Sequence, residues 1–205
     1  MQTSLKTLLK SQLEGHAKLH LHGQPPQAHV VSSGRHENSA SDAFRINDKL
    51  VVYTASCGAM ARGEIQSLKR DGIVVLVTTS SGLAFHVEVG GSDKERSLTR
   101  VSSGAIVRDL EKAIRRASKR SSARGSKSVL QILRVPSMHV SAVWVHHPKK
   151  SIADVFVPYT ANFATLRPGR TYKLQRIQFL LKKEAIRMIL RWYNRYEKSH
   201  IQSNA

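Results

Sequence analysis

The sequence contains a single cysteine, Cys57, which excludes an internal disulfide framework and any multi-cysteine zinc module. One lone thiol is typical of a reducing compartment, so we expect an intracellular protein. No apolar run approaches the roughly 18 residues that a membrane-spanning helix needs, which predicts a soluble chain with no transmembrane segment. The N-terminus also lacks the apolar run of a secretory signal and, before Arg35, the arginines of a mitochondrial presequence.

Aromatic residues are scarce, at 6% of the chain, and no expected strand carries paired aromatics. A sheet that binds RNA chiefly by stacking bases is therefore not expected. Gly125-Ser126-Lys127 lacks the upstream glycine spacing of a phosphate-binding P-loop, so nucleotide hydrolysis has no motif. His16, His20 and His22 cluster, but no carboxylate or cysteine with ligand spacing completes a metal set. We predict no metal site and no cofactor.

Acidic residues are few, and they are fewest in the second half of the chain. The formal net charge is +19. Residues 1–100 hold 12 Lys and Arg against 9 Asp and Glu, whereas residues 101–205 hold 21 against 5, so the net charges are +3 and +16. A field this strong favours binding to nucleic acid or to an anionic surface.

The composition divides the chain into three parts. Residues 1–22 form an amphipathic N-terminal arm, with Leu5, Leu8, Leu9 and Leu13 spaced for one face of a helix. Residues 23–46 are rich in Gln, Pro, Ser and Asn and are predicted to be a flexible linker. Residues 47–205 form an α+β domain whose second half is strongly basic. The sequence shows no internal repeat of useful length.

The α+β domain is predicted to hold a mainly antiparallel sheet, a middle helix and a long C-terminal helix. Four strands are expected over residues 50–55, 64–68, 73–79 and 83–89, with turns at 69–72 and 80–82 and a polar, turn-rich stretch at 90–103. This pattern is also that of a small SH3-like or Sm-like barrel within residues 47–90, although many unrelated sheets share it. Helical spacing resumes at Ile106, and three further strands are expected over residues 129–135, 138–146 and 154–159.

The last helix is predicted over residues 171–198, with Thr171 as its N-cap. One side is a core-facing seam. It is formed by Leu174, Ile177, Leu181, Ala185, Met188 and Trp192, with Ile189, Tyr193 and Tyr196 beside it. A separate ridge of cations recurs every fourth residue, interrupted by Glu184. It comprises Lys183, Arg187, Arg191 and Arg195, with Arg176 further back along the helix.

Two other basic segments accompany this ridge. Residues 115–127 contain six basic and no acidic side chains, and Arg167 and Arg170 precede the last helix. We therefore predict a non-catalytic protein that binds DNA or RNA through phosphate contacts. The predicted contact residues are Arg115, Arg116, Lys119, Arg120, Arg124, Lys127, Arg167, Arg170, Arg176, Lys183, Arg187, Arg191 and Arg195.

An alternative is an interaction protein, such as an assembly subunit or an exported effector, whose basic face meets an acidic protein or an anionic membrane. The apolar arc of the last helix favours this alternative, because it extends to Phe179, Ile186 and Leu190 and is broader than one core contact needs.

A third alternative is an enzyme. Cys57 paired with His86 suggests a cysteine hydrolase. Asp71 with Glu88 suggests a metal-dependent nuclease, although the lysine of a Glu-x-Lys arrangement is missing. His139, His146 and His147 offer acid–base cleavage of RNA, and strand alternation would place His139 and His147 on one face and His146 on the other.

Overall fold

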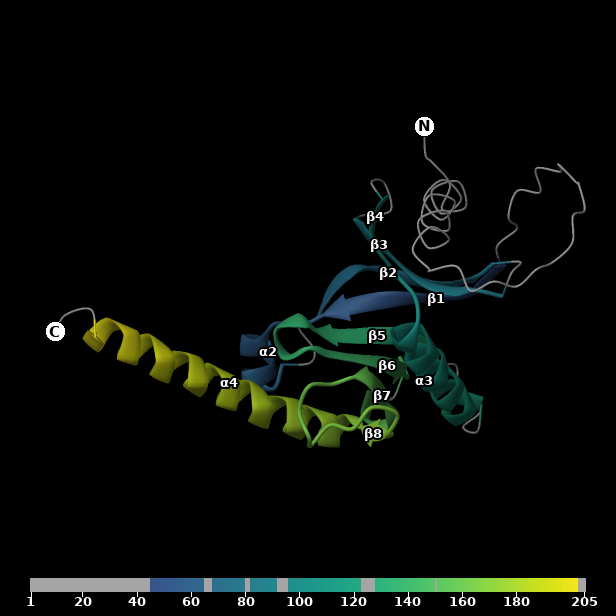
Figure 1. Cartoon of the computed structure of the whole chain (residues 1–205). Coiled ribbons are helices and arrows are strands. Elements are labelled where there is room, and N and C mark those ends of the chain that lie inside the picture. Colours follow the sequence, from purple (N-terminus) through teal and green to yellow (C-terminus); the bar gives the residue numbers. More distant parts are fainter. Residues whose placement is uncertain are drawn as a thin grey trace, which may run out of the picture.

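The computed structural model describes residues 45–64, 68–79, 82–91, 96–122, 128–149 and 151–202. Over these residues the predicted α+β class is confirmed, because one mixed eight-stranded sheet is flanked by helices (Figure 1). The predicted arm at 1–22 and all but the last two residues of the predicted linker lie outside the described residues. The first strand begins at Arg45, two residues before the expected start of the domain.

The first half of the sheet is an antiparallel meander that ends in a helix. Short helix α2 (Cys57–Arg62) follows the first strand; Ser56 caps its N-terminus, and Gly63 ends it in a left-handed conformation. The other elements are β1 (Arg45–Thr54), β2 (Lys69–Thr78), β3 (Ala84–Gly91), β4 (Arg96–Ser102) and α3 (Ala105–Ser122).

The second half repeats this order of four antiparallel strands followed by a helix. The 3-10 turns η2 (Pro136–Met138) and η3 (Ser151–Ala153) connect its strands. Its main elements are β5 (Val129–Val135), β6 (Val140–His146), β7 (Val155–Thr160), β8 (Tyr172–Lys173) and α4 (Leu174–Gln202).

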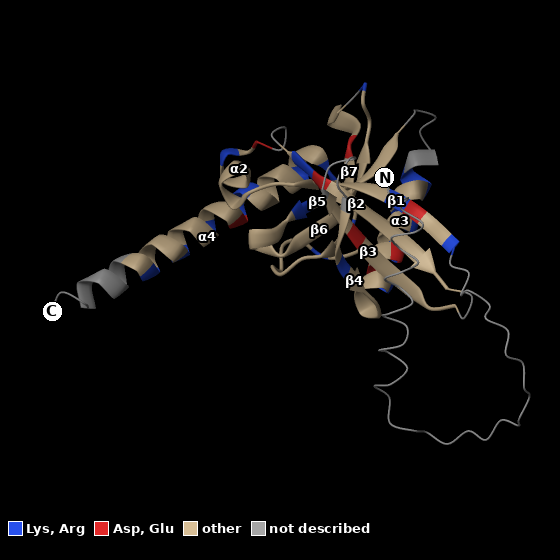
Figure 2. Ribbon diagram, turned by 90° about the horizontal axis from the view of Figure 1, so that it is seen from above, with Lys and Arg blue, Asp and Glu red and all other residues tan. Residues whose placement is uncertain are grey.

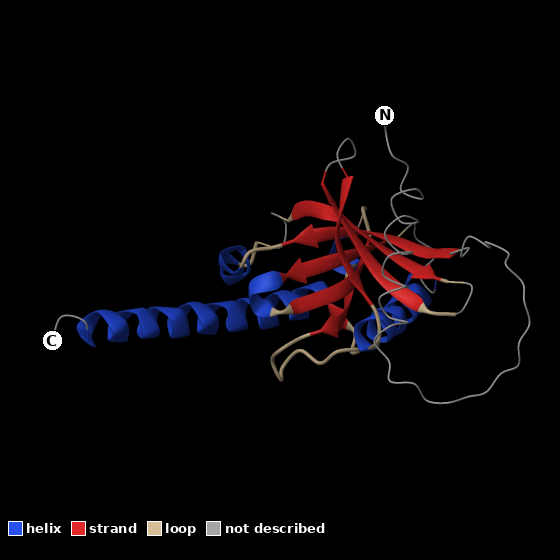
Figure 3. Cartoon of the chain, turned by 45° about the horizontal axis from the view of Figure 1, so that its top comes forward, coloured by secondary structure: helices blue, strands red, loops and turns tan. Residues whose placement is uncertain are grey.

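The two halves join through the first strand of each. β1 and β5 pair in parallel, which gives the strand order β4-β3-β2-β1-β5-β6-β7-β8. Figure 3 shows the strands of this sheet in red and the helices beside it in blue. The remaining strands of each meander lie on the outer side of this parallel pair. A rotation of 180° about an axis parallel to β1 and β5, in the plane of the sheet, therefore exchanges the two meanders. The same rotation also exchanges the two faces of the sheet. Helices α3 and α4 accordingly cover opposite faces, so the structure contains a repeat of topology that the sequence does not display.

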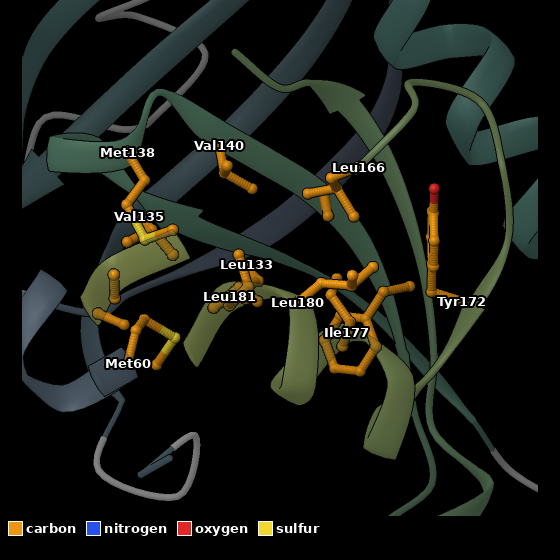
Figure 4. Close-up of a cluster of buried hydrophobic side chains, with 14 of the residues drawn as sticks. Met60, Leu133, Val135, Met138, Val140, Leu166, Tyr172, Ile177, Leu180 and Leu181 are labelled. Carbon is orange, nitrogen blue, oxygen red and sulfur yellow. The ribbon is translucent and has the colours of Figure 1, made fainter. Parts of the chain in front are cut away.

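Alternating residues of the central strands supply two separate cores. Ile132 faces α3 in a cluster that also contains Leu110 and Val143. Leu133 faces the other way, into the core formed with α2 and α4 (Figure 4). Both faces of the sheet are thus buried over β5 and β6, which explains the nearly continuous apolar runs in those strands.

Strand β2 is also buried on both faces. Val74 and Leu76 belong to the core under α3, whereas Ile73, Val75 and Val77 belong to a third cluster with residues of β3. Residues 47–90 therefore do not form the small barrel considered from the sequence, because their strands are part of the eight-stranded sheet.

Three local predictions in the first half were wrong. Glu64 lies outside any strand, and Leu68 precedes β2 rather than ending a strand. The expected turn at 69–72 is the start of β2, where a Cβ on Gly72 would collide with the carbonyl oxygen of Val89. This glycine permits close approach of two strands, so it does not mark a turn. The polar stretch at 90–103 contains β4, which pairs with β3 despite its few apolar residues.

Helix α4 also differs from its prediction. It begins at Leu174, and the preceding Tyr172–Lys173 forms strand β8, so Thr171 is not the N-cap. The core-facing seam holds as far as Met188, and Trp192 beyond it is 67% exposed. The helix extends past the sheet, as Figure 1 shows, so its last turns have no sheet beneath them.

Candidate nucleic-acid interface and polar pocket

Helix α3 presents a group of cations in its last turns. Arg115, Arg116, Lys119 and Arg120 are all exposed, because the apolar positions of this helix face the sheet. Lys119 and Arg120 lie in the final turn, where cations interact favourably with the helix dipole. Arg124 and Lys127, also predicted as contacts, lie outside the described residues.

The loop before α4 lies against these cations. A guanidinium nitrogen of Arg116 donates a hydrogen bond to the carbonyl oxygen of Gly169. Gly169 has φ 76°, a conformation that favours glycine, and a Cβ there would lie 2.9 Å from the same nitrogen. This contact brings exposed Arg167 and Arg170 to the end of α3. We call the resulting group the basic edge, and it comprises Arg115, Arg116, Lys119, Arg120, Arg167 and Arg170.

Few carboxylates balance the basic edge. Arg115 pairs with Glu111 at 3.8 Å, but its side chain is 77% exposed, so the pair is weak. The other members of the edge form no ion pair with a carboxylate of the described residues. Arg170 lies over the ring of Tyr172 at 5.9 Å from the centroid. The positive charge of the basic edge is therefore available to an external anion.

The predicted ridge on α4 consists of exposed residues, but it is not straight. An α-helix advances about 400° over four residues, so cations spaced by four drift about 40° per step and about 120° from Lys183 to Arg195. Arg187 pairs with Glu184 at 3.3 Å, and Arg176 lies over the ring of Phe179 at 5.7 Å. Figure 2 shows these cations distributed along the projecting helix. The structure thus places the α4 cations on a longer and more winding surface than the basic edge.

The same helix exposes large apolar side chains on the side away from its core. Phe179, Ile186, Leu190 and Tyr193 are 56%, 41%, 56% and 53% exposed. Trp192 stacks on Tyr196 with ring centroids 5.7 Å apart. The breadth predicted for the apolar arc of this helix is therefore real, and the described elements do not bury it.

A cavity of about 470 Å³ lies at the other end of α3, beside Ile106. It is lined by a bidentate ion pair in which Arg134 of β5 donates to both carboxylate oxygens of Glu88 on β3, at 2.9 Å each. Two strands separate β3 from β5, which is roughly 14 Å across a flat sheet. Since the side chains nevertheless meet, the sheet curls around this cavity.

Two neutral polar side chains are buried in the cavity wall. His86 is 1% exposed, and burial lowers its pKa to about 4, with Arg134 and Arg100 opposing protonation and Glu88 favouring it. Burial also raises the pKa of Tyr159 above its ordinary value, although Arg134 and Ser141 nearby partly oppose this shift. Both groups are therefore uncharged near neutral pH.

The structure does not assemble the cysteine site considered from the sequence. Cys57 packs against α4, where its thiol lies 3.7 Å from the carbonyl oxygen of Ala185. Burial raises the pKa of this thiol, so the reactive thiolate is disfavoured. His86 lines the cavity on the α3 side of the sheet, and the two residues therefore lie on opposite faces.

Asp71 and Glu88 do share one cavity, as a carboxylate pair requires. However, Glu88 is held by Arg134, and Asp71 accepts a hydrogen bond from the Thr54 hydroxyl at 2.8 Å. Within the described ranges, no three His, Cys, Asp or Glu side chains are grouped so that they could hold a metal ion. The arrangement therefore gives no support to a metal-dependent nuclease.

The three histidines of the RNA-cleavage hypothesis are separated. His139 precedes β6 in a left-handed conformation, with φ 51°, and lines the cavity. His146 and His147 follow at the far end of the strand, and both contact Asp154. This buried carboxylate accepts hydrogen bonds from the Trp144 indole at 2.9 Å and from the His147 amide at 2.7 Å. Asp154 is thus a structural anchor, and the predicted opposite placement of His146 and His147 does not hold.

Sequence reasoning missed the residues that complete the cavity, namely Arg100, Arg134 and Tyr159. A signal was available, because Arg134 interrupts an apolar strand, as His86 and Glu88 do in β3. A polar residue inside such a run is buried with a partner or faces a cavity. The strand pattern alone does not say which strands meet, so the pairing of Arg134 with Glu88 could not be predicted.

The chain matches no family model, no characterised protein and no solved structure in the comparisons made. Among the helices of the described residues, none is long and apolar enough to span a membrane.

Proposed function

We propose that the protein binds nucleic acid through phosphate contacts made by the basic edge, without catalysing a reaction on it. The observation that carries this proposal is the contact between Arg116 and Gly169, which gathers cations from two distant segments. A cluster of exposed cations with few carboxylates suits a phosphate backbone. The α4 cations, including Arg176, Lys183, Arg187, Arg191 and Arg195, extend the surface available to a long polyanion.

Binding of this kind is sensitive to salt and weakly selective for sequence, because phosphate contacts carry no sequence information. If the six cations of the basic edge each neutralise one phosphate of duplex DNA, log affinity falls against log salt with a slope of about −5. Fluorescence anisotropy with labelled duplex DNA, single-stranded DNA and single-stranded RNA, each at several salt concentrations, measures this slope and distinguishes the three ligands.

The variant Arg115→Glu/Lys119→Glu/Arg120→Glu tests the location of binding. We expect it to weaken binding by about 100-fold at low salt, since three contacts become repulsive. The matched control is Arg45→Glu/Lys49→Glu/Lys69→Glu, which makes the same change in net charge at exposed residues of β1 and β2. Equal losses in the two variants would assign binding to net charge alone. A flat salt response or unchanged affinity in the edge variant would refute the proposal.

A second candidate function is assembly with a protein partner through α4. Phe179, Ile186 and Tyr193 recur every seven residues and are exposed, which is the spacing that packs one helix against another. The cations on this helix favour a partner helix that carries acidic residues. The outward apolar stripe is the specific observation that supports this candidate, because the sheet does not cover it.

Multi-angle light scattering of the full chain across a range of concentrations tests self-assembly, against a monomer mass of 22.8 kDa. A larger species that reverts to monomer in Ile186→Asn/Leu190→Asn supports helix pairing. A monomer at every concentration, unchanged by these substitutions, rules out self-assembly through α4. The Lys182→Asn variant, at an exposed residue of the same helix, is the control for lost helix propensity.

A further inference from the structure

The cavity beside Ile106 has the character of a ligand site rather than of a packing defect. Both ring nitrogens of His86 and the hydroxyl of Tyr159 are buried without a hydrogen bond of good geometry, although Glu88 lies 3.5 Å from His86 Nε2 and Arg134 and Ser141 lie beside the hydroxyl. Each unsatisfied buried group destabilises the folded state, so such groups need an explanation. Gln131 and His147 also bury unpartnered atoms, but neither lines this cavity. Here His86 and Tyr159, from different strands, both line one cavity.

The charges of the cavity indicate what it can accept. Arg134 and Glu88 neutralise each other through their two hydrogen bonds, so the region around His86 is polar without a net charge. A neutral histidine offers one donor and one acceptor, and the tyrosine hydroxyl can do either. Arg100 and Asp71, which are both exposed, add one cation and one anion to the lining. An anionic part of a ligand would therefore lie at Arg100, and an uncharged hydrogen-bonding part would lie near His86.

The shape and size add a further constraint. The volume of about 470 Å³ lies within the range of small-molecule pockets. Ile106, Pro136 and Val140 provide apolar wall, against which a flat ring can lie. A nucleobase has a neutral edge of donors and acceptors and apolar faces, and its phosphate supplies the anion.

We propose that this cavity binds a nucleotide, with the edge of the base hydrogen bonded to His86 and Tyr159 and the phosphate at Arg100. The nucleotide is either a free mononucleotide or one residue of a single strand. The second source rests on the proposed function of the basic edge, whereas the first does not. The basic edge lies roughly 15 Å further along α3, since ten residues separate Ile106 from Arg116.

Isothermal titration of the full chain with AMP, GMP, CMP and UMP, and with inorganic phosphate, tests the proposal. We expect at least one mononucleotide to bind with a Kd below 1 mM, and inorganic phosphate to bind at least tenfold more weakly. Tyr159→Phe, which removes only the hydroxyl, should weaken mononucleotide binding about tenfold, the effect of one lost hydrogen bond. Its unfolding midpoint should change little, because the contacts of the hydroxyl with Arg134 and Ser141 are not hydrogen bonds of good geometry.

The matched control is Tyr172→Phe, which removes a hydroxyl that accepts a hydrogen bond from the Arg167 amide at 2.9 Å. This control should unfold more easily and keep its mononucleotide affinity. The proposal is overturned if no mononucleotide binds with a Kd below about 1 mM, if phosphate binds equally well, or if Tyr159→Phe retains full affinity.

The variant Arg115→Glu/Lys119→Glu/Arg120→Glu separates this inference from the proposed function. It should keep mononucleotide binding while losing oligonucleotide binding. In the parent protein, failure to bind oligonucleotides while mononucleotides still bind refutes only the basic edge, and the reverse result refutes only the cavity. If the occupant is a residue of a single strand, Tyr159→Phe also weakens single-stranded oligonucleotides but leaves duplex affinity unchanged.

Discussion

The arginines near the two ends of helix α3 differ in burial and in pairing. Beside its first turn, Arg134 of β5 is only 20% exposed and donates two hydrogen bonds to Glu88. At its last turns, Arg115 is 77% exposed and has only a distant carboxylate. A partly buried charge must be paired to be tolerated, whereas an exposed one is stabilised by water. An arginine side chain thus stabilises the fold at one end of α3, whereas at the other end arginine side chains are available to bind an anion.

Removal of Arg134 should have the largest effect on stability of the substitutions at the two ends of α3. Arg134→Ala leaves the Glu88 carboxylate, which is 13% exposed, without its partner in the curled sheet. We expect the free energy of unfolding to fall by about 3 kcal/mol, as for other buried pairs that lose one member. Urea denaturation followed by circular dichroism measures this change.

The double variant Glu88→Leu/Arg134→Met is the control for lost packing. It removes both charges and keeps similar volumes, so stability should return to within about 1 kcal/mol of the parent protein. If the double variant is as unstable as Arg134→Ala, packing of the arginine stem rather than an unpaired carboxylate explains the loss.

Acidification should produce a smaller effect at the same end of α3. The folded pKa of His86 is about 4, below its unfolded value of 6.5, so the unfolded chain binds the proton first as pH falls. Arg134 and Arg100 face this ring and oppose its protonation, while Glu88 favours it. Stability is therefore full above about pH 6.5 and is lost as pH falls toward 4, by about 2 kcal/mol between pH 7 and pH 5.

The variant His86→Leu isolates this contribution. Urea titrations at pH 7, 6 and 5 should show a shallower pH dependence in the variant than in the parent protein. Parallel slopes would mean that His86 protonates as easily in the folded chain as in the unfolded chain.

The sequence predicted elements better than it predicted contacts. Periodicity placed α3, α4 and most of the apolar strands correctly, because burial of one face imposes a repeat on neighbouring residues. The exception is the strand expected over residues 64–68, since neither Glu64 nor Leu68 lies in a strand. Strand β4 was missed because its exposed residues alternate with few apolar ones, and β8 was missed because two residues carry no period. The parallel pairing of β1 with β5 joins segments that are distant in the chain, and no local pattern encodes it.

For the candidate sites too, the sequence predicted individual residues better than it predicted their contacts. Exposed cations such as Arg115 and Arg120 could be predicted, since a run of like charges is not buried. Their meeting with Arg170 depends on a single contact of Gly169, which the sequence did not reveal. The cavity depends on curling of the sheet that brings Glu88 to Arg134 across two strands, so none of its geometry was available from spacing.

The smallest expected effect on stability concerns the exposed end of α3, where substitutions should change anion binding more than stability. In Arg115→Gln/Lys119→Gln/Arg120→Gln, the lost ion pair of Arg115 at 3.8 Å and the lost dipole contacts of the last turn should together cost about 0.5–1 kcal/mol of stability. The slope of log affinity against log salt on duplex DNA should nevertheless become shallower by about 3, because each neutralised phosphate contributes about 0.9. Denaturation and anisotropy on one preparation measure both quantities. If stability instead falls as far as in Arg134→Ala, the cations of the basic edge hold the fold, and loss of binding on charge reversal reports unfolding instead of a lost interface.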